Sequence, residues 1–143
     1  ELKNIAENLI DTFNIAGQES IDLYKKGLKI EIKDDKSPVS NGDLRANELI
    51  TNKIKELTPS IPIISEETVD IKIKNTAKIF WLIDPIDGTK EYIAGKDEYT
   101  LNAALVIDTI PSESLTSPII SSPVCSLIIF IFFILTSYHK TLN

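Results

Sequence analysis

The stretch that decides the fold of this chain reads Trp81-Leu82-Ile83-Asp84-Pro85-Ile86-Asp87-Gly88-Thr89-Lys90-Glu91-Tyr92-Ile93. Its first residues end a continuous apolar run, Ile79–Ile83, which is typical of a strand buried on both faces. Pro85 lacks an N–H group and has a fixed φ angle, so the strand is expected to stop there. Gly88 then allows a sharp turn before a short helix that begins at Thr89. The sequence therefore predicts a strand, a turn and a helix in immediate succession.

Two carboxylates follow the apolar run at a spacing that suits a metal ion. Asp84, Asp87 and the carbonyl oxygen of Ile86 can converge on one point at the end of the strand. Oxygen ligands, two of them anionic, suit a hard cation such as Mg²⁺. Asp-Pro and Asp-Gly are also common turn signals, so a motif of this kind is more often structural when it stands alone. The metal assignment therefore depends on the neighbouring motifs.

Composition restricts the chemistry that the chain can perform. Its 143 residues, 43% hydrophobic and 25% charged, are typical of one soluble globular domain. The net charge of −6 and the pI near 4.8 argue against a surface that binds nucleic acid or anionic membranes. Cys125 is the single cysteine, and the single histidine, His139, has no acidic neighbours, which argues against a disulfide framework, a zinc site or a histidine triad. Carboxylates and hydroxyls must therefore carry the chemistry.

The N-terminal part of the sequence predicts two helices and a strand. Apolar residues recur at helical spacing over residues 2–26, which predicts an amphipathic helix that packs on a core. Polar and apolar residues alternate over Lys29–Lys33, which predicts a half-buried strand. Ser40 and Asp43 then fit a capping box for a second helix that ends before Pro59. Capping alone would be a sufficient role for Asp43.

Two further strands are expected on either side of the central stretch. The short apolar segment 62–65 ends in two acids, Glu66 and Glu67, and such pairs are usually solvated surface. Residues 68–78 are polar and lysine-rich, which indicates an exposed connection. The alternating pattern over 99–107 predicts a strand with a packing role.

Together these motifs resemble the inositol monophosphatase superfamily of Mg²⁺-dependent phosphatases. The segment 84–89 after a buried strand is similar to the signature of that superfamily. Within it, Lys90-Glu91-Tyr92 and the loop pattern Lys33-x-Asp35-x-Ser37-Pro38-Val39-Ser40-x-x-Asp43 resemble the CysQ-type 3′(2′),5′-bisphosphate nucleotidases more than the inositol monophosphatases. The resemblance covers residues 1–108, with three motifs in the expected order.

The resemblance implies a fold and a set of site residues. The implied fold is α/β, layered α+β, and forms part of the αβαβα sugar-phosphatase arrangement, with two N-terminal helices on a largely antiparallel sheet. The implied Mg²⁺ ligands are Glu66, Asp84, the carbonyl of Ile86 and Asp87. The implied catalytic groups are Asp43 and Thr89, which orient and activate the attacking water, together with Glu66. The substrate phosphate is expected to contact Asp87, Gly88 and Thr89.

One part of the superfamily pattern is missing from these 143 residues. The superfamily carries a further metal-binding aspartate in a Trp-Asp-x-Ala-Ala-Gly motif of a C-terminal half, and the sequence contains no such motif. We therefore expect residues 1–108 to be the N-terminal part of a phosphatase domain whose C-terminal half is absent. The start at Glu1, without a signal peptide, is interpreted as a fragment or processed end.

Residues 109–143 differ in kind from the rest of the chain. Their charged side chains are Glu113 and Lys140, and Leu127–Leu135 is an uninterrupted apolar run. A membrane-spanning helix needs ~20 such residues. We interpret this tail first as disrupted or out-of-frame sequence, then as a buried strand, and last as a membrane segment. Deleting it is expected to improve solubility.

The favoured function is hydrolysis of adenosine 3′,5′-bisphosphate to AMP and phosphate with Mg²⁺ as the cofactor. Inositol monophosphatase is the alternative, and a non-catalytic remnant whose tail binds a membrane or partner is an alternative of another class. We expect a small phosphorylated substrate, no nucleic acid partner and a cytoplasmic protein, with the cytoplasmic face of the membrane as the disfavoured alternative location. Activity of the truncated chain is doubtful, and the sequence leaves its oligomeric state open.

Overall fold

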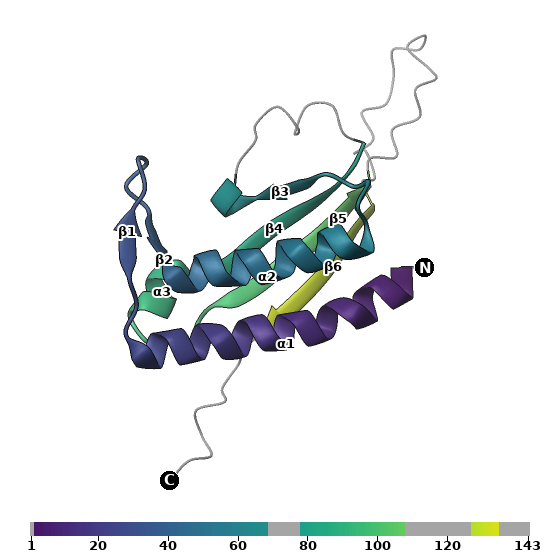
Figure 1. Ribbon diagram of the computed structural model, residues 1–143. Coiled ribbons are helices and arrows are strands. Elements are labelled where there is room, and N and C mark those ends of the chain that lie inside the picture. Colours follow the sequence, from purple (N-terminus) through teal and green to yellow (C-terminus); the bar gives the residue numbers. More distant parts are fainter. Residues whose placement is uncertain (1, 69–77, 108–126, 135–143) are drawn as a thin grey trace, which may run out of the picture.

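A helical layer covers one face of a four-stranded sheet in the computed structural model, which describes residues 2–68, 78–107 and 127–134 (Figure 1). Helices α1 (Leu2–Lys26) and α2 (Asn41–Leu57) run across the same face of the sheet. The strands lie in the order β3 (Ile63–Ser65), β4 (Ile79–Asp87), β5 (Thr100–Ile107) and β6 (Leu127–Ile134). Among these described strands, β3 and β4 pair in parallel, and the pairs β4–β5 and β5–β6 are antiparallel. The predicted layered fold with a largely antiparallel sheet is therefore confirmed.

The core lies between the two helices and the sheet face that they cover. Its fully buried large side chains include Leu9, Phe13, Ile50, Ile54, Trp81, Ile83 and Leu101. Burying one such side chain contributes roughly 1.5–3 kcal/mol. The indole N–H of Trp81 donates to the hydroxyl of Thr58 across 3.0 Å, which satisfies the one polar group of that side chain. The apolar faces of the two predicted helices thus pack against the core, as the sequence predicted.

The helix ends also follow the sequence. Ser40 and Asp43 form the predicted capping box, in which each side chain accepts a hydrogen bond from the backbone of the other residue. Gly27 follows α1 with φ near 96°, a left-handed conformation that ends the helix with little strain.

The central strand differs from its prediction in two ways. It is buried on one face only: Trp81 and Ile83 are buried, whereas 43% of Ile79 and 43% of Leu82 is exposed. Among the described residues, helices cover only the Trp81 side of the sheet, so the prediction of two buried faces is wrong. The strand also continues to Asp87, with a shift in register between Asp84 and Asp87. Proline thus interrupts the ladder without ending the strand.

Strand β1 (Ile30–Ile32) is exposed throughout, so the predicted half-buried strand is wrong in its burial. Within the described ranges it pairs with β2 (Pro38–Ser40) alone, in a separate two-stranded sheet. This hairpin stands beside the N-terminal end of α2 (Figure 1), and its second strand is more buried than its first, since Val39 and Ser40 are buried. Its turn contains Lys36 with φ of 69°, and the Asp35 carboxylate accepts hydrogen bonds from the N–H and hydroxyl of Ser37. Local hydrogen bonds therefore hold this loop.

The apolar run near the C-terminus contains a strand. Strand β6 pairs with β5 from Leu127 opposite Ile107 to Ile134 opposite Thr100. This pairing agrees with the strand alternative for the tail. The expected connection over 68–78 lies largely outside the described residues, as do Cys125 and His139. In the part of the chain that the structure describes, no helix is long and apolar enough to cross a membrane.

Candidate metal centre

Three of the predicted metal ligands lie at one end of the parallel strand pair. Ser65 is the register partner of Ile83, so the next residues along the two strands are Glu66 and Asp84. The carboxyl ends of parallel neighbours meet at the same sheet edge, which brings these two acids together. Glu66 starts a 3₁₀ turn, η1 (Glu66–Thr68), while Asp87 ends β4. The sequence alone placed these residues at strand ends, and the register explains why they are neighbours.

Asp84 carries the clearest electrostatic signal of the site. Burial, together with the negative charges of Glu66 and Asp87, raises its pKa to about 7. Its Oδ1 atom is buried and has no hydrogen-bond partner among the described residues. A buried carboxylate oxygen beside two further carboxylates needs either a proton or a cation. This arrangement fits a hard cation such as Mg²⁺.

The acidic side chains of this site do not converge on a single point in the described structure. Within residues 2–68 and 78–107, no three His, Cys, Asp or Glu side chains converge closely enough to hold an ion. Glu66 is half-exposed and its Oε1 lies 3.7 Å from the ammonium of Lys33. The metal-binding role of the three acids and of the Ile86 carbonyl therefore remains a prediction.

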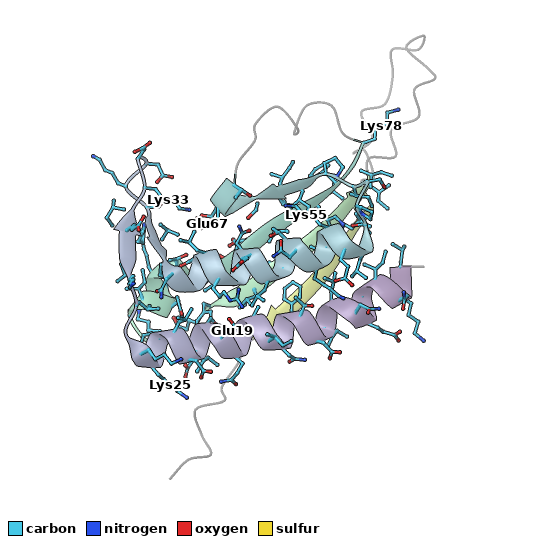
Figure 2. The ribbon with its side chains drawn as sticks, viewed as in Figure 1. Glu19, Lys25, Lys33, Lys55, Glu67 and Lys78 are labelled. Carbon is cyan, nitrogen blue, oxygen red and sulfur yellow. The ribbon has the colours of Figure 1, made fainter. Side chains whose placement is uncertain are left out.

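Lys33 is a residue of the site that the sequence did not single out. Its Nζ atom lies 2.9 Å from Oε1 of Glu67, and the two side chains point toward each other (Figure 2). Only 6% of the Glu67 side chain is exposed. Burial raises the pKa of Glu67, although the hydrogen bond and charge of Lys33 oppose this effect. The lysine was visible within the loop pattern, but nothing in the sequence indicated that its hairpin bends toward η1.

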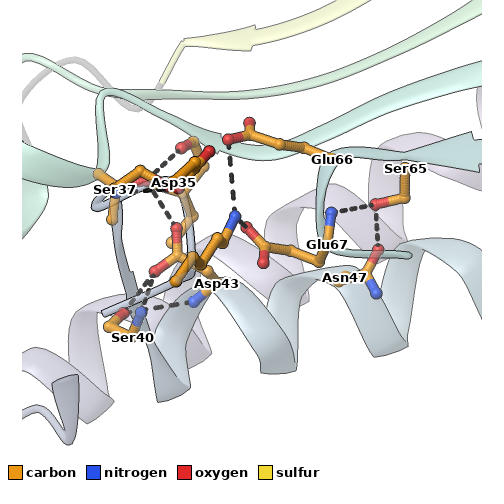
Figure 3. A network of polar contacts seen from close by, with 11 residues as sticks. Asp35, Ser37, Ser40, Asp43, Asn47, Ser65, Glu66 and Glu67 are labelled. Atoms are coloured by element: carbon orange, nitrogen blue, oxygen red, sulfur yellow. Dashed lines mark hydrogen bonds and ion pairs between the residues drawn. The ribbon is translucent and has the colours of Figure 1, made fainter. Parts of the chain in front are cut away.

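A second set of contacts fixes the turn that carries Glu66. The hydroxyl of Ser65 donates to Oδ1 of Asn47 on α2 across 2.7 Å and accepts the backbone N–H of Glu67 at 3.3 Å (Figure 3). Both Ser65 and Asn47 are buried. Helix α2 thereby positions the first residues of η1 through one serine hydroxyl.

Asp43 and Thr89, the predicted pair for water activation, lie in contact. Asp43 is 1% exposed, and its Oδ2 accepts hydrogen bonds from the N–H and hydroxyl of Ser40. Its Oδ1 lies 2.9 Å from the Thr89 hydroxyl, which also lies 3.1 Å from the carbonyl oxygen of Ile86. The Asp43 carboxylate thus caps α2 with one oxygen and accepts a hydrogen bond from the Thr89 hydroxyl with the other.

Gly88 occupies a position that other residues would strain. Its φ is 96°, and a Cβ atom there would lie 2.9 Å from the backbone oxygen of Glu98. The glycine leads directly into α3 (Thr89–Ile93), as the sequence predicted, and its carbonyl accepts the N–H of Tyr92. The phosphate-binding role of Asp87, Gly88 and Thr89 remains a prediction.

Comparisons with known proteins place the chain among members of one family. The model of the inositol monophosphatase family matches residues 1–125. A protein named 3′(2′),5′-bisphosphate nucleotidase CysQ, from Aggregatibacter actinomycetemcomitans, is 33% identical over 110 residues, which are 76% of this chain and 41% of that protein. The CysQ crystal structure from Bacteroides thetaiotaomicron is 35% identical with a TM-score of 0.57, over 74% of this chain and 39% of that one.

A third relative shows the fold alone. It is the crystal structure of an IMPase/NADP phosphatase complexed with Mg²⁺ and phosphate, which is 20% identical with a TM-score of 0.60 and covers 73% of this chain and 40% of that one. The chain thus spans about two fifths of the length of the relatives that it matches.

Proposed function

Because the chain belongs to the inositol monophosphatase family, we propose that it is part of a Mg²⁺-dependent phosphomonoesterase, a 3′(2′),5′-bisphosphate nucleotidase. The observation that carries the metal assignment is the buried, unpartnered oxygen of Asp84 beside Glu66 and Asp87. The nucleotidase assignment is supported by the Aggregatibacter relative of that name, which is 33% identical. The Bacteroides structure, which is named CysQ and described as a member of the inositol monophosphatase family, is 35% identical.

Glu66, Asp84, Asp87 and the Ile86 carbonyl would hold the cation. When bound, Mg²⁺ neutralises phosphate oxygens and lowers the pKa of water. Thr89 donates to Asp43 and keeps oxygen lone pairs free to accept a hydrogen bond from the attacking water. Asp43 can then take up the proton that passes through the threonine hydroxyl, because its Oδ1 has no other hydrogen-bonding role in the described structure.

The activity belongs to a longer protein than this chain. The chain spans about two fifths of its relatives, and the expected Trp-Asp-x-Ala-Ala-Gly motif does not occur in its sequence. We propose that residues 1–108 supply the catalytic acids and that a C-terminal half supplies the remaining metal ligand and the nucleotide contacts. The 143 residues alone should then release little or no phosphate. Cytoplasmic placement remains a prediction.

A chimera tests this proposal. Residues 1–108 would be joined to the C-terminal part of the Aggregatibacter relative, and phosphate release would be measured with adenosine 3′,5′-bisphosphate and with inositol 1-phosphate. We expect Mg²⁺-dependent turnover, a higher kcat/KM for the nucleotide, and loss of turnover in Asp84→Asn. A folded chimera that prefers inositol 1-phosphate would favour the alternative substrate. A folded chimera without any turnover would favour the non-catalytic remnant.

A further inference from the structure

Two buried side-chain oxygens have no hydrogen-bond partner among the described residues, and they belong to neighbouring strands. One is Oδ1 of Asp84 on β4, and the other is Oδ1 of Asn102 on β5. The two residues are register partners in the antiparallel ladder. Side chains of such partners stand on the same face of a sheet, with Cβ atoms about 4.5–5.5 Å apart. Two unsatisfied acceptors therefore lie side by side.

The orientation of the Asn102 amide follows from its other contact. Its Nδ2 atom donates to Oδ2 of Asp87 across 3.3 Å. A carboxylate only accepts hydrogen bonds, so the amide nitrogen faces Asp87 and the amide oxygen points away from it. The same side chain thus contacts one predicted metal ligand and presents a free oxygen beside another.

Two adjacent acceptors without a donor need a proton donor or a cation between them, because each otherwise carries the cost of desolvation. We propose that the carboxamide oxygen of Asn102 is a further ligand of the divalent cation that Asp84 and Asp87 hold. This proposal rests on the metal site of the proposed function and adds a residue to it. A neutral oxygen is a suitable ligand for a hard cation, and it adds no further charge to three acids that already repel one another.

The first test measures Mn²⁺ binding to the full 143-residue chain by titration calorimetry. Asn102→Leu removes the oxygen at similar size, and we expect its Mn²⁺ affinity to fall about tenfold or more. Val106→Leu, on the same strand and face but opposite Phe80, serves as the matched control and should bind as the parent does. The near-ultraviolet circular dichroism of buried Trp81 reports whether each variant is folded.

A second test separates a ligand from a residue that only positions Asp87. In a Cys125→Ser background, Asn102→Cys places a soft sulfur at the proposed ligand position, and soft thiolates favour soft metals. We expect the ratio of Cd²⁺ to Mn²⁺ affinity to rise about tenfold or more over that background, with an ultraviolet thiolate-to-cadmium absorption band. Val106→Cys in the same background should show neither change.

The outcomes distinguish this inference from the site on which it rests. If the parent chain binds no Mn²⁺, the metal site itself fails, and this inference fails with it. If the parent binds Mn²⁺ but Asn102→Leu binds equally well, only the ligand role of Asn102 is overturned. Weaker Mn²⁺ binding in Asn102→Leu without a Cd²⁺ response in Asn102→Cys would also overturn it, since the amide would then act only through its donor to Asp87.

Discussion

The hydroxyl of Thr89 lies 2.9 Å from Oδ1 of Asp43, across 46 positions of the sequence. This contact joins the N-terminal ends of α2 and α3, because Asp43 belongs to the capping box of α2 and Thr89 is the first residue of α3. The two ends meet beside the predicted metal ligands. One hydrogen bond thus links the helical layer to the turn after the central strand.

Removing the Thr89 hydroxyl should affect both stability and catalysis. Thr89→Val keeps the shape of the side chain but leaves Oδ1 of a buried Asp43 without its donor, which should cost about 1–3 kcal/mol in the free energy of unfolding. In the chimera, the same change should lower kcat by about 10²–10⁴. Urea unfolding and phosphate release measure the two effects. Thr89→Ser keeps the hydroxyl and should retain most of both, and a Val variant as active as the parent would exclude the proton role.

The ion pair between Lys33 and Glu67 gives a prediction with a defined pH dependence. Lys33→Met leaves an almost fully buried carboxylate without its cation, so unfolding near pH 7 should become easier by about 1.5–3 kcal/mol. Burial already raises the pKa of Glu67, and losing the lysine raises it further. Protonation then relieves the unpaired charge, so the loss of stability should shrink as the pH falls toward about 5.

Urea unfolding at the two pH values checks this prediction. Lys55→Met changes an exposed lysine on α2 and serves as the control. Glu67→Gln in the Lys33→Met chain should restore part of the lost stability, because it removes the unpaired charge. A loss that is equal at both pH values would show that the lysine contributes packing rather than charge.

Asp84 gives a second prediction about how stability depends on pH, because its pKa is raised to about 7 in the metal-free chain. An unfolded aspartate titrates near ~3.9, so the folded state binds this proton more tightly. The contribution of this carboxyl to stability is therefore fully present below about pH 4 and is lost as the pH rises through about 7. Added Mg²⁺ should stabilise the chain clearly near pH 8 and little near pH 5.5, since a proton competes with the metal at low pH.

Thermal unfolding with and without Mg²⁺, at both pH values, measures this effect. Asp84→Asn replaces the titratable carboxyl with a neutral amide, so the stability of this variant should depend less on pH and on Mg²⁺. Equal stabilisation by Mg²⁺ at pH 5.5 and 8 would contradict the assignment of the titrating group to the metal site.

The sequence predicted the positions of helices and strands more reliably than the burial of their faces. Helical spacing and the capping box of Ser40 and Asp43 set α1 and α2 correctly, because these signals are local. The exposure of β1 and of Leu82 depends on which layers cover a strand, and no local pattern reports that. An apolar run such as Ile79–Ile83 is compatible with one or two covered faces.

The same difference between local signals and tertiary contacts applies to the site. The motif around Asp84 and Asp87 identified candidate ligands, but their closeness to Glu66 comes from the register between β3 and β4. Lys33 reaches Glu67 over 34 positions, and Asn102 reaches Asp87 across a ladder whose register shifts at the proline. Such contacts are tertiary, so residue type and spacing did not indicate them.

The pairing of β6 with β5 changes the expectation for a chain that ends at residue 108. The sequence favoured this deletion as a way to improve solubility. In the structure, however, β5 would keep its pairing with β4 but lose its pairing with β6 along all eight residues, and an unpaired edge promotes association. We now expect residues 1–108 to be less stable and less soluble than the full chain. Urea unfolding and the soluble fraction after expression test this, and improvement on deletion would support foreign sequence after residue 108.

The most direct test of the metal centre is calorimetric titration of the 143-residue chain with Mn²⁺ near pH 7.5, beside its Asp84→Asn and Glu48→Gln variants. Asp84 lies among the predicted ligands, whereas Glu48 is an exposed acid on α2 whose ion-pair partner is Arg45. The account predicts weak saturable binding to the parent and to Glu48→Gln, and its loss in Asp84→Asn. A binding isotherm that is unchanged in Asp84→Asn would contradict the account.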